Sequence, residues 1–157
     1  MPAAPLPALE KAMRYLAARP LSELELLAKL RRAGYSDCEA DAAIDECRKR
    51  HYLDDDLLTG DCVNYLRTQR NLGSRQIKFK LAKRGLDMET VSEMLAEKPE
   101  EELLAAQRAA ETKLRLLKNE NDCRKKREKL FRFLAGRGFS PEIVFKVLDL
   151  TLHRTDE

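Results

Sequence analysis

The sequence is poor in the residues that carry most metal, redox and catalytic chemistry. Its 157 residues contain no tryptophan, two histidines and four cysteines. None of the cysteines forms a Cys-x-x-Cys pair, and His51 and His153 stand far from any ligand-like spacing, so the pattern does not indicate a zinc site. We expect ordinary reduced thiols, which are typical of a cytosolic protein.

Catalytic and targeting motifs are absent from the sequence as well. No nucleophile stands beside a base in a recognisable motif, no glycine-rich phosphate loop follows a strand, and no paired acids suggest acid–base chemistry. The first 13 residues, MPAAPLPALEKAM, have neither a long apolar core nor a basic leader, so neither a signal peptide nor a membrane span is predicted. The expectation is a cytosolic, monomeric protein that is not an enzyme and uses no cofactor or metal.

Three consecutive carboxylates, Asp54 to Asp56, have two interpretations. They are typical of a helix N-terminus, where the helix dipole favours negative charge. They also resemble part of a site for a hard metal ion, but such a site needs more oxygen ligands than this run supplies. We therefore favour a helix cap.

Helical periods recur along the chain, alternating strand patterns are almost absent, and a weak repeat is present. The segment from Leu30 to Tyr35, LRRAGY, matches segments that begin 51 residues later at Leu81 and a further 53 residues later at Leu134. The match continues at two later positions, which are occupied by Ala40, Val91 and Val144 and by Ile44, Leu95 and Leu148. Such self-similarity predicts an array of structural units.

Each copy of the repeat is interpreted as three helices. In the first copy, Ser22-x-x-Glu25 and Ser36-x-x-Glu39 are capping boxes that begin the second and third helices, and Gly34 ends the second helix. The predicted fold class is all-α, with three tandem three-helix (helix-turn-helix-like) repeats. The predicted boundaries are an N-terminal tail at 1–7, repeats at 8–53, 54–99 and 100–152, and a C-terminal tail at 153–157.

Two groups of apolar side chains are expected in the core. The long helix from about Glu100 to Lys118 is expected to bury one face, made of Leu103, Leu104, Ala110, Leu114 and Leu117. The four tyrosines are expected to be core residues with a polar tip at the surface; they are Tyr15, Tyr35, Tyr52 and Tyr65.

Acidic and basic stretches alternate along the chain, although the net charge is only +3. The stretch from Asn64 to Leu86 carries seven positive side chains and no negative one. Residues 36–61 and 87–111 are acidic, and residues 113–137 are again basic. Charge of one sign on two adjacent helices is a poor way to gain stability, so it indicates a surface for a polyanion or an acidic protein.

Phe79 stands out within this basic stretch. On a helical wheel it falls opposite Ile77 and Leu81, which must face the core, and its counterparts in the other copies are Ala28 and Arg132. The fold therefore does not demand an apolar group here. Two interpretations remain open: Phe79 packs on a neighbouring copy, or it is an aromatic anchor in a basic contact surface.

Several motifs in combination resemble the RecX family of bacterial recombination regulators. The segment from Pro20 to Leu30, PLSELELLAKL, with Gly34-Tyr35-Ser36 after it, resembles the first copy in that family. Residues 52–55 resemble its Gly-Tyr-Leu-Asp-Asp junction, residues 72–85 resemble its second-copy helix, and residues 132–140, RFLAGRGFS, resemble its closing segment. The likeness runs from about Ala8 to Leu150.

The sequence also departs from the family pattern at a few positions. Ser74 stands where proline is usual, and His51 stands where glycine is usual. An Arg-Phe pair that commonly follows the aspartates is replaced by Leu57-Leu58. This replacement removes one basic and one aromatic side chain from the first helix of the middle copy.

The resemblance implies a function that composition and spacing do not show. It implies an elongated, curved stack of repeats that binds the RecA recombinase, in particular its nucleoprotein filament, and inhibits it without catalysis. Such a protein blocks filament extension or lies in the filament groove, and suppresses ATP hydrolysis, strand exchange and co-protease activity. From charge placement, the expected contact residues are Arg67, Arg70, Arg75, Lys78, Lys80, Lys83, Arg84, Arg132 and Arg137, with Phe79 as the aromatic anchor.

A rival hypothesis is a DNA-binding helical module without sequence specificity, which would use the same basic helices on phosphates. A helix that reads base edges is expected to be rich in Asn, Gln and Arg, and only Gln76 in the candidate helix fits that chemistry. Weak binding of single- or double-stranded DNA is compatible with both hypotheses.

Overall fold

The structure, a computed structural model, describes residues 4–153. The outermost residues of the two predicted tails, 1–3 and 154–157, lie outside the described residues. Within residues 4–153 the chain forms nine helices and no strand. These are α1 (Ala8–Ala18), α2 (Glu23–Arg32), α3 (Asp37–Lys49), α4 (Asp55–Thr68), α5 (Ser74–Lys83), α6 (Met88–Ala96), α7 (Pro99–Leu116), α8 (Cys123–Gly136) and α9 (Pro141–Leu152).

Six of the nine described helices begin at a residue whose side chain accepts a hydrogen bond from the first turn. Both predicted capping boxes form: the Ser22 and Ser36 hydroxyls accept from the backbone N–H of Glu25 and Glu39 at 3.1 and 3.2 Å. Asp54 caps α4 by accepting from the Leu57 N–H at 3.0 Å, which confirms the interpretation as a helix cap. Caps of this kind stabilise a helix by about 1 kcal/mol each.

The second helix of each triplet ends at a glycine in the left-handed conformation. The φ angles of Gly34, Gly85 and Gly138 are 97°, 74° and 92°. An L side chain is strained at such φ angles, so glycine is the residue that ends a helix there at little cost. The predicted helix stop at Gly34 is therefore confirmed, and Gly85 and Gly138 end the second helices of the other two copies in the same way.

Each triplet of helices encloses its own hydrophobic core. The positions that match in the three copies are all buried: Leu30, Leu81 and Leu134, Ala40, Val91 and Val144, and Ile44, Leu95 and Leu148. They belong to three separate clusters, one for each triplet. The repeat detected in the sequence is therefore a repeat of core positions.

The third core differs from the expectation for α7. Its buried face is made of alanines, Ala105, Ala106, Ala109 and Ala110, whereas Leu104 is 48% exposed. Alanine lets the backbones of two helices approach closely, and α7 packs tightly against α9. The prediction was correct for Ala110 and wrong for Leu104, because the closest packing here selects small side chains instead of leucine.

The tyrosines also divide into two groups. Tyr15 and Tyr35 pack against the first core, and the Tyr35 hydroxyl donates to the Leu6 carbonyl at 2.6 Å. Tyr52 and Tyr65 are 50% and 52% exposed, so the expectation of a core position was wrong for these two. A helical stripe alone does not show how far an adjacent helix covers it.

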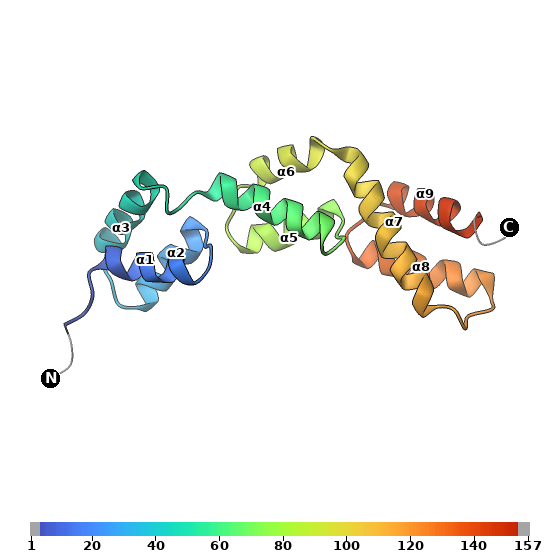
Figure 1. Cartoon of the computed structure of the whole chain (residues 1–157), viewed down its shortest axis with the longest axis horizontal. Coiled ribbons are helices and arrows are strands. Elements are labelled where there is room, and N and C mark those ends of the chain that lie inside the picture. The colour runs from blue at the N-terminus through green and yellow to red at the C-terminus, as the bar shows by residue number, and fades with distance from the viewer. Residues whose placement is uncertain (1–3, 154–157) are drawn as a thin grey trace.

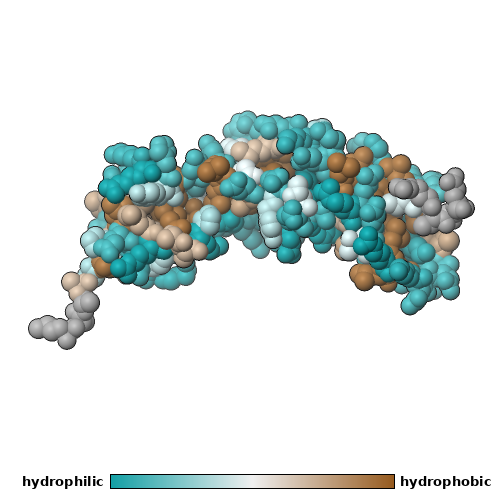
Figure 2. All heavy atoms as spheres, viewed as in Figure 1, coloured by the Kyte–Doolittle hydropathy of each residue, from teal (hydrophilic) through white to brown (hydrophobic). Residues whose placement is uncertain are grey.

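The three triplets follow one another in an elongated, curved array (Figure 1). In this view α6 and α9 lie along the outer side of the arch, and α5 and α8 lie along its inner side. Hydrophilic residues cover most of the face shown in Figure 2, and hydrophobic residues show in separate patches. Among the helices that the structure describes, none combines the length and hydropathy of a membrane-crossing segment.

Candidate functional site

The second helices of the three triplets, α2, α5 and α8, meet end to end. The Gly73 N–H, at the start of α5, donates to the Arg137 carbonyl at 2.9 Å, and the Arg75 N–H donates to the Gly138 carbonyl at 3.2 Å. At the start of α2, the Ser22 hydroxyl donates to the Arg84 carbonyl. We call the contact between the first two triplets joint 1 and the contact between the last two joint 2. At each joint, the C-terminus of the second helix of one triplet lies on the N-terminus of the second helix of the preceding triplet.

Both joints use an arginine at the same position of the repeat. In joint 1, Nη2 of Arg84 donates to the Pro20 carbonyl at 3.1 Å. In joint 2, Nε of Arg137 donates at 3.2 Å to the carbonyl of Asn71, which is the counterpart of Pro20. The first copy, which no other triplet precedes within residues 4–153, has Ala33 at the arginine position. The arginine therefore occurs in the copies that need it to join a preceding triplet.

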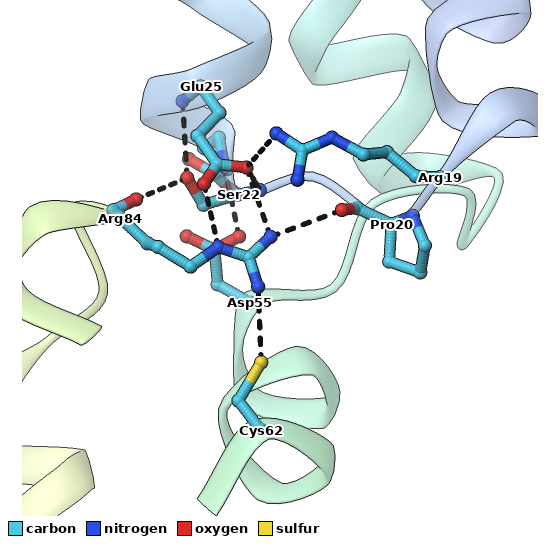
Figure 3. Close-up of polar contacts among 8 residues, drawn as sticks. Arg19, Pro20, Ser22, Glu25, Asp55, Cys62 and Arg84 are labelled. Carbon is cyan, nitrogen blue, oxygen red and sulfur yellow. Dashed lines mark hydrogen bonds and ion pairs between the residues drawn. The ribbon is translucent and has the colours of Figure 1, made fainter. Parts of the chain in front are cut away.

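Joint 1 adds an ion pair to this arrangement (Figure 3). Nε and Nη2 of Arg84 donate to the two carboxylate oxygens of Glu25 at 2.7 and 3.1 Å, and Nη1 lies 3.2 Å from Sγ of Cys62. Burial works to raise the pKa of Glu25, but the hydrogen bonds from Arg84 and Ser22 and the nearby positive charges outweigh it and hold that pKa below 4.5. Burial raises the pKa of the Cys62 thiol, against the effect of Arg84.

At each joint, a carboxylate of the following triplet also accepts a hydrogen bond from the first turn of the preceding triplet's second helix. The N–H of Glu23, the first residue of α2, donates to Asp55 Oδ1 at 3.0 Å. The N–H of Ser74, the first residue of α5, donates to Glu102 Oε1 at 2.9 Å. An anion at a helix N-terminus satisfies free N–H groups and is favoured by the dipole. These contacts give part of the acidic stretches a structural role.

Glycine permits the close approach at both joints. A Cβ atom on Gly73 would lie 2.3 Å from the carbonyl carbon of Gly138, and one on Gly138 would lie 2.4 Å from the backbone nitrogen of Gln76. A Cβ on Gly85 would lie 2.3 Å from Cδ2 of Leu24. The φ of Gly73 is −76°, so glycine is required there by the contact and not by the backbone conformation.

Arg67 is buried inside joint 2, with 2% of its surface exposed. Its Nη2 donates to the Ser74 hydroxyl at 2.7 Å, and its Nε has no hydrogen-bond partner within residues 4–153. Desolvation lowers the pKa of Arg67, and the charges of Glu102 and Glu101 oppose that shift. This side chain joins α4 to the start of α5 beside the acidic first turn of α7, and it does not reach the surface.

The structure therefore corrects the expected basic surface at three positions. Arg67 is buried, and Arg84 and Arg137 are half-buried and bonded within the joints. Their charges are used inside the protein, so we remove them from the candidate contact set. The signal for Arg84 and Arg137 was present in the sequence, as an arginine directly before the helix-ending glycine in the second and third copies only. No local signal marked Arg67.

Six of the expected basic residues remain available. They are exposed, and they have no ion-pair partner in the part of the chain that the structure describes: Arg70, Arg75, Lys78, Lys80, Lys83 and Arg132. Five lie on or next to α5, and Arg132 lies on α8. We call these six residues and Phe79 the basic face. It spans joint 2.

Phe79 is at the centre of the basic face and is 54% exposed. The Lys83 ammonium lies 4.3 Å from the centre of its ring, which is a favourable cation–π distance. The ring also borders a hollow of about 350 Å³ between α5 and the end of α8, lined by Arg75, Gln76, Phe79, Ala135, Gly136 and Gly138. Phe79 therefore lies beside the neighbouring triplet and leaves half its surface exposed, and its role as an aromatic anchor stays a prediction.

The basic run at the start of α8 is less available than the basic face. Arg124 pairs with Glu128 at 3.4 Å, and Arg127 pairs with Asp149 at 3.1 Å. Lys125 and Lys126 have no ion-pair partner among residues 4–153. Part of this run is thus neutralised by neighbours.

Comparison with protein families supports the resemblance noted in the sequence. Family models described as the first and the third three-helix domain of RecX match residues 8–47 and 100–148. The regulatory protein RecX of Vibrio campbellii is 30% identical over 137 residues, which cover 83% of either chain. The regulatory protein RecX of Chlorobaculum tepidum is 30% identical over 145 residues, which cover 92% of this chain and 88% of the relative.

Some relatives are longer than this chain. The match covers 65% of the regulatory protein RecX of Clostridium beijerinckii and 52% of that of Geobacillus thermodenitrificans. Among solved structures, RecX from Lactobacillus salivarius superposes with a TM-score of 0.80 at 22% identity, covering 91% of this chain and 95% of that one. The present protein therefore has the same fold as the Lactobacillus protein. On the sequence matches and the domain models together, the chain belongs to the RecX family of regulatory proteins.

Proposed function

We propose that this protein binds the nucleoprotein filament of the RecA recombinase and inhibits its ATP hydrolysis, strand exchange and co-protease activity. It does so by blocking filament extension or by lying in the filament groove. It acts as a cytosolic monomer and has no catalytic chemistry of its own. The family of regulatory proteins to which the chain belongs supports this proposal, and the RecA partner follows from the resemblance to that family.

The observation that carries the proposal is the basic face, whose residues lie mainly on α5, a helix on the inner side of the arch (Figure 1). Six exposed cations without ion-pair partners in residues 4–153 are concentrated along α5, from joint 2 towards joint 1, with Arg132 on α8. They repel one another in the free protein, so a partner of opposite charge gains more from them than the fold does. A filament of protein on DNA offers a long, repeating surface of phosphates and acidic side chains to such a face.

The test is ATP hydrolysis by RecA on single-stranded DNA, with this protein added first at substoichiometric and then at stoichiometric amounts. We expect inhibition at amounts too small to cover the DNA, because a regulator of filament growth acts at few sites. Inhibition that begins only when the DNA is saturated would contradict a filament regulator.

The second candidate function is a DNA-binding helical module without sequence specificity. It is favoured by the combination of Phe79 with Lys83 and Arg75, because aromatic rings and cations are the usual contacts to single strands. Binding to free DNA should then fall steeply as salt rises. A protein that binds free DNA tightly and inhibits RecA only by competing for DNA would support this candidate.

A further inference from the structure

A second exposed apolar site lies between α8 and α9 and shares only Arg132 with the basic face. Phe131 and Phe145 face each other there, with ring centres 5.4 Å apart and planes inclined at 43°. Beside them is a hollow of about 200 Å³, lined by Arg127, Glu128, Phe131, Arg132, Phe145 and Leu148. Phe145 is 50% exposed. We call this site the α8–α9 groove.

The repeat shows that the fold does not require phenylalanine in this groove. The counterparts of Phe145 are Ser92 in the second copy and Asp41 in the first. The counterpart of Phe131 in the second copy is Lys78, which is exposed. Two of the three copies therefore fold with a polar side chain at the Phe145 position. The aromatic pair is specific to the last triplet.

The α8–α9 groove includes Arg127 and Glu128, which lie in the first half of α8. At joints 1 and 2, the start of α2 or α5 is covered by the following triplet, but the described chain has no triplet after α9. α8 begins four residues before the position that matches the start of α5, and Asp122 caps this extra turn by accepting from the Arg124 and Lys125 N–H groups. An exposed aromatic pair beside this part of α8 indicates a contact site.

The rim of the groove is positive. Arg132 has no ion-pair partner in residues 4–153, and Arg127 is paired with Asp149, whose carboxylate is itself exposed. Glu128 is paired with Arg124. A partner that fills the hollow with an apolar group therefore gains most if acidic groups flank it.

We propose that the α8–α9 groove binds a leucine or aromatic side chain carried by an acidic segment of a protein partner. The hollow is of side-chain size and its floor is apolar, which suits one anchoring residue. The two rings are inclined to each other and offer no flat, cation-lined platform of the kind that single-stranded nucleic acid uses. Within the proposed function, on which this inference rests, the groove makes a protein contact and the basic face meets the rest of the filament.

The binding test uses the full chain with labelled methyl groups, observed by NMR, and a synthetic peptide of Asp and Glu residues around one Phe. We expect the peptide to shift the methyl signals of Leu148. We expect the variant Phe145→Ser, which installs the residue of the second copy, to bind the peptide at least tenfold more weakly. Phe145→Leu should keep most of the affinity, and Phe79→Ala should leave it unchanged.

Comparison probes separate the possible ligands. A peptide with Gly in place of Phe, or with Lys in place of the acids, should not bind at the groove. The proposal is overturned if the Phe peptide leaves Leu148 unshifted, if Phe145→Ser binds it as the wild type does, or if oligo(dT) shifts the same signals more strongly. The last outcome would identify the groove as a nucleic-acid site.

The functional readout is RecA ATP hydrolysis with wild-type protein and Phe145→Ser. We expect the variant to need at least tenfold more protein for the same inhibition, with unchanged binding to oligo(dT). Equal inhibition by both proteins overturns the proposal for the α8–α9 groove but leaves the proposed function intact. No inhibition by the wild type, together with peptide binding in the groove, overturns the proposed function but leaves the groove as a protein-binding site.

Discussion

Arg84 and Glu25 lie 59 residues apart in the sequence, and their side chains form a two-point ion pair across joint 1. Both side chains are mostly covered, with 25% and 19% of their surfaces exposed. At joint 2, by contrast, α4 packs along α7, and no pair of the helices in residues 4–153 makes a comparable contact across joint 1. The position of the first triplet therefore depends on a few polar contacts around Arg84.

The first prediction concerns this ion pair. Arg84→Ala should lower the free energy of unfolding of the first two triplets by about 2 kcal/mol, between the values for exposed and buried pairs. It should also widen the distribution of distances between the first and third triplets, measured by small-angle scattering. Arg14→Ala, which removes an exposed pair with Glu10 inside α1, should change neither quantity. Equal effects of the two variants would show that joint 1 does not depend on Arg84.

The second prediction is a pH dependence from Glu25. Its folded-state pKa lies below 4.5, so the folded state binds this proton less readily than the unfolded chain. The stability it contributes is fully present above pH 4.5 and is lost as the pH falls through the lower, folded-state pKa. Urea unfolding over a pH series should therefore show a smaller acid-induced loss for Glu25→Gln than for the wild type.

Asp55 provides an internal comparison for this titration. Burial raises its pKa above the ordinary value, so its protonation on acidification stabilises the folded state and opposes the effect of Glu25. Asp55→Asn should therefore steepen the acid-induced loss of stability, whereas Glu25→Gln should flatten it. The same slope in both variants would rule out this assignment.

The third prediction tests the close approach at joint 2. Gly73→Ala places a Cβ against the backbone of Gly138 and should destabilise the contact between the last two triplets by about 1–3 kcal/mol, the usual cost of overpacking. Gly60→Ala is the matched control, because that glycine lies inside α4 with open space around it. It should raise stability by about 0.5–1 kcal/mol. Urea unfolding of both variants measures these two changes in stability, and a Gly73→Ala variant as stable as the wild type would contradict the prediction.

The fourth prediction concerns the basic face. Reversing the charge at Lys78, Lys80 and Lys83 together should raise the protein concentration needed for half-inhibition of RecA ATP hydrolysis at least tenfold. The three side chains are exposed and make no ion pair within residues 4–153, so far-ultraviolet circular dichroism should not change.

A control with the same change in net charge distinguishes the basic face from a general charge effect. Suitable exposed residues outside α5 and α8 are Arg32, Lys49 and Lys118. Their reversal should leave inhibition within about twofold of the wild type, because at physiological salt charges beyond a Debye length of roughly 8 Å act only weakly. Equal loss in both triple variants would mean that net charge, and not this surface, governs binding.

The helices and the repeat could be predicted because their signals are local. Ser22 with Glu25 and Ser36 with Glu39 form caps three residues apart, and Gly85 ends α5 within its own turn. Each such signal needs only its immediate neighbours. The expectation failed where packing between helices decides exposure, as for Leu104 and Tyr65.

The sequence by itself determined an all-α chain of three similar units and the stretch in which positive charge is concentrated. Only the tertiary structure decided which charges are free. Arg84 and Arg137 find their partners 59 to 67 residues away, and Arg67 is buried by α7, which follows it by some thirty residues. Local spacing cannot distinguish an arginine that holds two triplets together from one that faces solvent, because the two differ only in what the folded chain brings beside them.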